Sequence, residues 1–159
     1  MAQQETTNMT ANDTLMASVT DHGLLKDLDP RYAHKLASLA LEAHFEPEQV
    51  IFKEKDTAGF FYLILSGSVT LEIVGPARRI EIEILHGGEG MGWSALLSEE
   101  PKHLQARALT EVRALAFEGK GLREACDNHP EFGYALMKRL LAMAVERLDA
   151  AGYQLINRY

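Results

Sequence analysis

The most informative stretch of the sequence is LHGGEGMGWSALL at positions 85–97, followed by SEEPKHLQARA at positions 98–108. A strand-like run ends in a glycine-rich turn, which leads into a very short helix, a proline, a cation and a second strand. Glycines let the backbone approach a ligand closely, and the first N–H groups of the helix, at Ser94 to Leu96, have no partners within it. A helix start favours negative charge, and Lys102 adds a positive one. The stretch therefore predicts a site for a small anion.

The residues around this stretch predict an antiparallel β structure, because short runs rich in β-branched and aromatic residues alternate with turn-forming residues. The runs are Val50–Phe52, Phe60–Leu65, Val69–Ile73, Ile80–Ile84, Leu104–Ala108 and Val112–Phe117. In the fourth run, isoleucines alternate with Glu81 and Glu83, so we expect the isoleucines to be buried and the glutamates to face solvent. About eight strands at this spacing predict a closed or rolled sheet over residues 43–117.

Helical patterns flank the β region. Asp29 and Pro30 supply an N-cap and a first-turn proline for a helix that we expect to end near Ala43. Residues 119–127 predict a short helix, and residues 130–157 a helix of about 27 residues, roughly 40 Å long. The predicted fold class is α+β: a jelly-roll-like antiparallel β-roll of about eight strands, flanked by N-terminal helices and a long C-terminal helix. We interpret residues 1–20 as a flexible tail and residues 21–159 as one domain.

The long C-terminal helix carries a heptad pattern. Apolar or aromatic side chains recur along it at steps of three and four, at Tyr134, Met137, Leu141, Ala144, Leu148, Ala151 and Leu155. Such a seam packs either on the β-roll of its own chain or on a second copy. We expect the first half to pack on the roll and the second half to form a homodimer, with Met137, Leu141, Ala144 and Leu148 in the dimer helix.

Composition limits the classes of function. The chain has 159 residues, a formal net charge of -7 and 25% charged residues. This acidic balance argues against a general nucleic-acid-binding surface, because affinity for phosphate backbones comes largely from Lys and Arg. Cys126 is the only cysteine, which excludes an internal disulfide. No apolar stretch approaches the ~20 residues that span a bilayer. We therefore expect a cytoplasmic protein without membrane contact.

No motif in the sequence indicates catalysis. The six histidines are scattered, and no two of them are two positions apart, as the metal site of a cupin barrel would need. No nucleophile elbow or Walker loop stands out. Arg107, on the strand that follows the anion stretch, is interpreted as a solvent-facing charge. We expect no enzyme activity, no catalytic residue and no metal.

These motifs together resemble the cyclic-nucleotide-binding domain family, which includes bacterial catabolite-activator regulators, protein kinase A regulatory subunits and nucleotide-gated channels. The resemblance extends from about Leu24 to Asn157 and includes the LSGSV turn at positions 65–69. The phosphate-binding cassette of the family typically reads Gly-Glu-x-Ala-Leu, a few residues, and then Pro-Arg-(Ala/Ser)-Ala. The positions that match it are Gly92, Ala95, Leu96 and Pro101, with Gly59 and Gly88 at the usual turns.

Two positions depart from this cassette. The family's glutamate, which accepts the ribose 2′-hydroxyl, falls on Trp93, and its arginine, which pairs bidentately with the cyclic phosphate, falls on Lys102. Lysine keeps the positive charge but cannot form the two parallel hydrogen bonds of a guanidinium group. Tryptophan has no carboxylate to accept a hydrogen bond from the ribose, and its side chain is larger. Both losses together weaken cyclic AMP or GMP binding by roughly three orders of magnitude. The cassette also resembles a recurrent bacterial variant, which would make the pocket specialised. The ligand-binding residues that the resemblance implies are Gly92, Trp93, Ser94, Ala95, Lys102, His103 and Leu104.

The resemblance implies a non-catalytic regulatory or sensor module. A small anionic ligand, either cyclic AMP or GMP or another phosphate-containing molecule, would bind the cassette and shift the C-terminal helix, which changes what an unidentified protein partner contacts. The alternative is a ligand-independent protein-interaction and dimerisation module whose pocket is filled by Trp93. No cofactor is expected besides such a ligand. Because the chain stops at Tyr159, we expect a stand-alone protein without the helix-turn-helix DNA-binding domain of many bacterial relatives.

Overall fold

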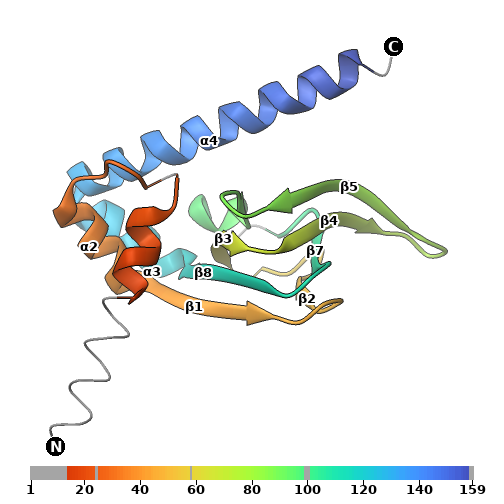
Figure 1. The fold of residues 1–159 in the computed structure, drawn as a ribbon, viewed down its shortest axis with the longest axis horizontal. Helices are drawn as coiled ribbons and strands as arrows, with labels where there is room; N and C mark the ends of the chain where they lie inside the picture. The colour runs from red at the N-terminus through yellow and green to blue at the C-terminus, as the bar shows by residue number, and fades with distance from the viewer. Residues whose placement is uncertain (1–13, 24, 58, 99–100, 158–159) are drawn as a thin grey trace, which may run out of the picture.

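The computed structural model describes residues 14–23, 25–57, 59–98 and 101–157. Within these residues a β-roll lies below one long helix, with shorter helices at one end (Figure 1). The helices are residues 14–21, α2 (Pro30–Leu39), α3 (Gly119–Asn128), α4 (Pro130–Ile156) and the 3₁₀ helix η1 (Trp93–Leu96). The strands are β1 (Ala40–Phe45), β2 (Val50–Phe52), β3 (Phe60–Ser66), β4 (Ser68–Val74), β5 (Arg79–His86), β6 (Gly90–Met91), β7 (Gln105–Ala108) and β8 (Val112–Glu118).

The strands form two four-stranded antiparallel sheets, with the orders β1-β8-β3-β6 and β2-β7-β4-β5. In the first sheet Leu63 lies opposite Leu115, and in the second Leu71 lies opposite Ala106. These side chains are buried, because alternate residues of each strand point toward the space inside the roll. The predicted antiparallel β-roll with about eight strands is confirmed.

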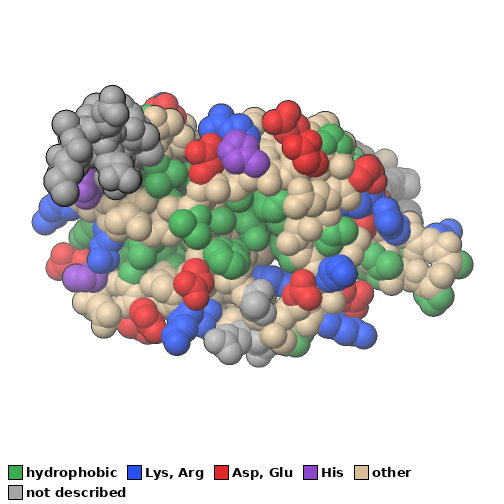
Figure 2. All heavy atoms as spheres, turned by 90° about the horizontal axis from the view of Figure 1, so that it is seen from below, with side chains coloured by type: hydrophobic (Ala, Val, Ile, Leu, Met, Phe, Trp, Pro, Cys, Tyr) green, Lys and Arg blue, Asp and Glu red, His purple; other side chains and the backbone are tan. Residues whose placement is uncertain are grey.

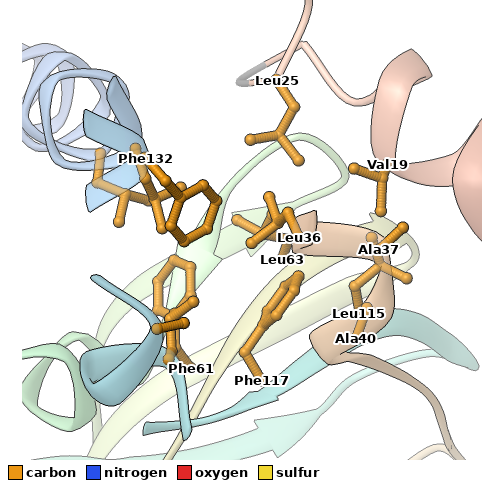
Figure 3. Close-up of a cluster of buried hydrophobic side chains, with 14 of the residues drawn as sticks. Val19, Leu25, Leu36, Ala37, Ala40, Phe61, Leu63, Leu115, Phe117 and Phe132 are labelled. Atoms are coloured by element: carbon orange, nitrogen blue, oxygen red, sulfur yellow. The ribbon is translucent and has the colours of Figure 1, made fainter. Parts of the chain in front are cut away.

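The end of the roll next to the short helices is closed by a hydrophobic cluster (Figure 3). Phe61, Leu63 and Phe117 come from the first sheet, Leu36 comes from α2, and Phe132 comes from the start of α4. α2 begins at Pro30 with the side chain of Asp29 accepting a hydrogen bond from the amide of Arg31, as an N-cap does.

The N-terminal segment differs from the prediction. Residues 14–21 are helical, and Val19 is fully buried in the cluster beside Leu25 (Figure 3). The flexible tail predicted through Thr20 is therefore wrong for residues 14–20, because Val19 gains burial there; residues 1–13 lie outside the described residues. α2 also ends at Leu39 and not near Ala43, because Ala40–Phe45 pair with β8 as strand β1.

Strand β5 is an edge strand, and its exposure differs from the prediction. Ile80, Ile82 and Ile84 are 43%, 52% and 39% exposed, although their alternation with glutamates indicated a buried face. The reason is that β5 pairs only with β4, and the β4–β5 hairpin extends beyond the rest of the roll (Figure 1). Glu83, expected in solvent, is half-buried and faces α4 through an ion pair with Arg147.

Helix α4 runs above β4 and β5 and ends short of the tip of the β4–β5 hairpin (Figure 1). Its first half is anchored by buried Phe132, Leu136, Leu140 and Met143, whereas residues 148–157 are exposed. The expectation that the first half packs on the roll is confirmed. The underside of the molecule, away from α4, carries hydrophobic side chains across its middle, with acidic and basic side chains around them (Figure 2). Among the described residues, no helix combines the length and apolar character needed to cross a membrane.

Alanine substitutions at two glycines with similar backbone angles test the turn geometry of the roll. Gly67 and Gly88 have φ values of +92° and +96°; a Cβ on Gly67 would lie 2.2 Å from the Glu111 carbonyl oxygen, whereas a Cβ on Gly88 would meet nothing within 4 Å. Alanine strains either backbone by roughly 1–3 kcal/mol, but only Gly67→Ala adds a steric overlap. We expect Gly67→Ala to lower the free energy of unfolding by about 2 kcal/mol more than Gly88→Ala in urea denaturation. Equal losses would contradict this turn geometry.

Candidate ligand-binding site

The candidate site is built on the turn between β6 and η1. Gly92 caps η1 in a left-handed conformation, with φ of +79°. A Cβ at this position would lie 2.4 Å from the Phe60 carbonyl oxygen and 3.6 Å from the Lys102 Nζ. Because only glycine allows such a close approach to β3, this turn places Trp93 and Ser94 beside Lys102.

A pocket of about 210 Å³ lies beside this turn. It is lined by residues from both sheets, the cassette and helix α4: Phe52, Leu71, Met91, Gly92, Trp93, Ser94, Lys102, His103, Leu104 and Arg147. Two of these residues, Lys102 and Arg147, are formal cations, and none of them is a carboxylate. Six of the seven predicted ligand-binding residues are thus brought together around one pocket. The seventh, Ala95, packs instead against Gly59 and Gly119.

Lys102 is buried at the centre of the site, with 5% exposure. Its Nζ donates to the Ser94 Oγ at 2.9 Å and to the Gly92 carbonyl at 3.4 Å, and it lies 5.3 Å from the centroid of the Phe52 ring. Burial lowers the pKa of this amine, while the nearby Asp56 carboxylate raises it. An ammonium group has three donors, so one remains for a ligand when the other two are used as described.

Trp93 forms one wall of the pocket. Its indole N–H donates to the Gly90 carbonyl at 3.2 Å, and its ring packs edge-on against Phe61 with the centroids 5.1 Å apart. The remaining volume is smaller than the roughly 300–1,000 Å³ of typical small-molecule sites. Trp93 therefore lines a small pocket and does not fill it.

The backbone of η1 offers less to an anion than predicted. The amide of Ala95 donates to the Gly92 carbonyl at 3.1 Å, because η1 is a tight 3₁₀ turn. The Ala95 carbonyl accepts from the Arg123 Nη1 of α3 at 2.5 Å. The prediction that the Ala95 amide is free for a ligand is therefore wrong, and the charges of the pocket lie on side chains.

Four lining residues were not predicted, namely Phe52, Leu71, Met91 and Arg147, and Arg147 is the charged one among them. Its Nη2 donates to the Glu83 Oε2 at 2.6 Å, and its Nη1 donates to the Gly90 carbonyl at 3.2 Å. The residue is 54 positions from Trp93 in the chain, and no local motif marks it. Only the docking of α4 over β5 brings it to the cassette.

Arg107 forms a largely buried ion pair with Glu72, so its interpretation as a solvent-facing charge is wrong. Its side chain is only 13% exposed, and its Nε and Nη2 each lie 3.0 Å from an oxygen of Glu72, which is almost fully buried. Gln105 adds a third hydrogen bond to this carboxylate at 2.8 Å. The guanidinium of Arg107 holds the pKa of Glu72 below its usual value, ahead of a smaller contribution from Gln105.

Comparison with known families identifies the class of this domain. The family model described as "Cyclic nucleotide-binding domain" matches residues 42–129, more than half of the chain. This range contains the turn, the cassette and seven of the strands in full. The chain belongs to the cyclic nucleotide-binding domain family. A solved cyclic nucleotide-binding domain from Methylobacillus flagellatus has the same fold, with a TM-score of 0.77 over 94% of this chain and 85% of that one at 17% identity.

Two curated relatives come from Mycobacterium tuberculosis. The HTH-type transcriptional regulator Cmr is 28% identical over 122 residues, which are 77% of this chain and 48% of Cmr. The CRP-like cAMP-activated global transcriptional regulator is 25% identical over 128 residues, 80% of this chain and 57% of that protein. The chain spans about half the length of these relatives. Because they are transcriptional regulators, the expectation that the protein lacks a DNA-binding domain is contradicted, and the end at Tyr159 does not support it.

The buried ion pair between β4 and β7 gives a stability prediction. Arg107→Met leaves the Glu72 carboxylate buried without its main partner, and breaking a buried pair in this way costs about 3 kcal/mol. Arg113→Met is a matched control, because Arg113 pairs on the surface with Glu42, where such pairs contribute about 0–1 kcal/mol. In urea denaturation at neutral pH we therefore expect Arg107→Met to lower the free energy of unfolding more than Arg113→Met does. Equal losses from the two variants would contradict the structural place of Arg107.

The same pair has a defined pH dependence. Because the folded-state pKa of Glu72 is lowered, its contribution is complete above the unfolded value of 4.5 and disappears as pH falls through the folded value. The stability difference between wild type and Arg107→Met should therefore shrink in acid. If the stability difference between wild type and Arg107→Met stayed constant from neutral pH down to below the folded-state pKa of Glu72, this pH dependence would be contradicted.

Proposed function

We propose that this chain is a non-catalytic regulatory module that binds a small anionic ligand in the cassette pocket and relays its presence through α4. The ligand is a cyclic nucleotide or another phosphate-containing molecule. The observation that carries the proposal is the pocket itself, whose described lining residues include two cations, Lys102 and Arg147, and no carboxylate. Lys102 is buried and Arg147 is half-buried, and such cations attract an anion more strongly than fully exposed ones do, because their surroundings screen charge less than water does.

Two observations support a regulatory role: the names of the curated relatives, and the position of α4. The curated relatives are transcriptional regulators by name. In this chain α4 both lines the pocket, through Arg147, and carries the exposed residues 148–157. A change at the pocket therefore has a direct route to a surface that a partner can contact.

We further propose that this surface pairs with a second copy of the chain. Met137, Leu141 and Leu148 are 37%, 65% and 72% exposed, and Ala144 is half-buried between them. These residues continue a heptad seam along α4, as in a two-stranded coiled coil. Closed two-fold dimers are the commonest assembly that such a self-complementary stripe forms.

Restoring the family pattern tests the ligand proposal. We expect Trp93→Glu with Lys102→Arg to strengthen cyclic AMP or GMP binding at least tenfold, about 1.4 kcal/mol, because the glutamate accepts from the ribose hydroxyl and the arginine forms two parallel bonds to the phosphate. Titration calorimetry on wild type and the double variant measures this. Lys102→Arg alone is the companion variant, since it leaves the contact between Trp93 and Phe61 intact.

Two results would contradict this reading of the pocket. Tight wild-type binding that the double substitution weakens would make Trp93 a specialised ligand contact. If neither phosphate nor a cyclic nucleotide binds wild type or Lys102→Arg, the alternative of a ligand-independent interaction module holds. The bonds of the Lys102 ammonium to Ser94 and Gly92 favour that alternative, because they satisfy the cation in part without a ligand.

The dimer proposal has its own test. Leu141→Glu with Leu148→Glu should convert dimers to monomers in light scattering, because two carboxylates would face two others across the seam. Leu97→Glu is the control, since Leu97 is 83% exposed and lies outside α4. A wild-type protein that is already monomeric at high micromolar concentration would refute the dimer.

A further inference from the structure

Arg147 lies between two cavities that differ in charge: carboxylates line the larger one, together with Arg139 and Arg147, and none of the described residues that line the cassette pocket is a carboxylate. On one side is the cassette pocket, which it lines with Lys102. On the other side is a larger cavity of about 510 Å³ between α4 and the turn before β6, where Glu83, Glu89 and Glu146 contribute carboxylates. Among the described residues that line these two cavities, Arg147 is the one that lines both.

In this structure the guanidinium of Arg147 forms its ion pair with Glu83, a residue that lines the larger cavity. Its Nη2 contacts Glu83 at 2.6 Å, with the side chains of Arg147 and Glu83 21% and 39% exposed, and its Nη1 contacts the Gly90 carbonyl. A partly exposed ion pair of this kind is weak. An anion in the cassette pocket offers a competing acceptor, and phosphate groups bind arginine bidentately.

We propose that Arg147 is a ligand-binding residue of the cassette pocket that exchanges Glu83 for the bound anion. The inference rests on the proposed anion-binding function and deepens it. Without ligand, Arg147 ties α4 to the edge strand β5. With an anion present, the guanidinium turns from Glu83 to the ligand, so that the ligand and Lys102 hold α4 from the pocket side.

This exchange explains how the pocket reaches the exposed half of α4. Arg147 is followed at once by residues 148–157, all of which are exposed, so none of them is buried against the roll. A change of partner at Arg147 acts where the packed part of the helix ends. Glu83 sets the threshold of the response, because its carboxylate competes with the ligand for one cation.

The exchange predicts effects of opposite sign on the two sides of the ion pair. Arg147→Gln should weaken the binding of inorganic phosphate and of cyclic AMP at least tenfold, and Arg147→Lys by less, because lysine keeps the charge without the fork. Glu83→Gln should strengthen binding about threefold or more, because it removes the competitor. Binding is measured by calorimetry and by the fluorescence of Trp93, the single tryptophan of the chain.

Two controls match the charge changes on the same helix. Arg139→Gln removes a cation and Glu146→Gln removes a carboxylate, and both residues line the larger cavity without lining the cassette pocket. Each should leave the affinity for phosphate and cyclic AMP within about twofold of wild type. Thermal denaturation of every variant checks that the fold is retained.

The outcomes separate this inference from the function on which it rests. If wild type binds either anion and Lys102→Met abolishes binding, but Arg147→Gln has no effect, the exchange is overturned and the anion-binding function stands. If Glu83→Gln weakens binding as Arg147→Gln does, the ion pair only shapes the pocket and the exchange is again overturned. If neither anion binds wild type or Glu83→Gln, both the function and the exchange fail.

Discussion

The site depends on where the Lys102 ammonium is held. It is buried between the Ser94 hydroxyl, the Gly92 carbonyl and the ring of Phe52, and this position is possible only because Gly92 brings its backbone against β3. A buried positive charge in this place is the basis on which we propose an anionic ligand. It also makes the pocket sensitive to every neighbouring charge, because surroundings of low polarity screen interactions weakly.

Much of the fold could be predicted from the sequence, because strand alternation, turn residues and the proline that starts α4 are local signals. The cassette position of Gly92, Trp93 and Lys102 was also predictable, since these residues lie close together in the chain. The errors have a common cause in tertiary contacts. The isoleucines of β5 are exposed because that strand is at an edge, Arg107 is buried because Glu72 comes from another strand, and Val19 is buried among residues distant in sequence.

Arg147 shows why part of the site could not be read from the sequence. Its role follows from the packing of α4 over β5, which no spacing rule specifies. Helix α4 lines the pocket through Arg147, and its residues 148–157 are exposed. We infer that the ion pair between Arg147 and Glu83 links the pocket to this exposed segment. Without ligand Glu83 holds Arg147, and with ligand the bound anion replaces Glu83 as the partner of Arg147. Trp93 lines the same pocket.

The most direct measurement of the central claim is the melting temperature of the wild-type chain with and without millimolar phosphate or cyclic AMP, compared with Lys102→Met. A ligand that binds only the folded state must raise the melting temperature, by an amount that grows with the ratio of ligand concentration to dissociation constant. The account predicts a rise for wild type with at least one of the two anions and none for Lys102→Met. No rise with either anion, or an equal rise in the variant, would contradict it.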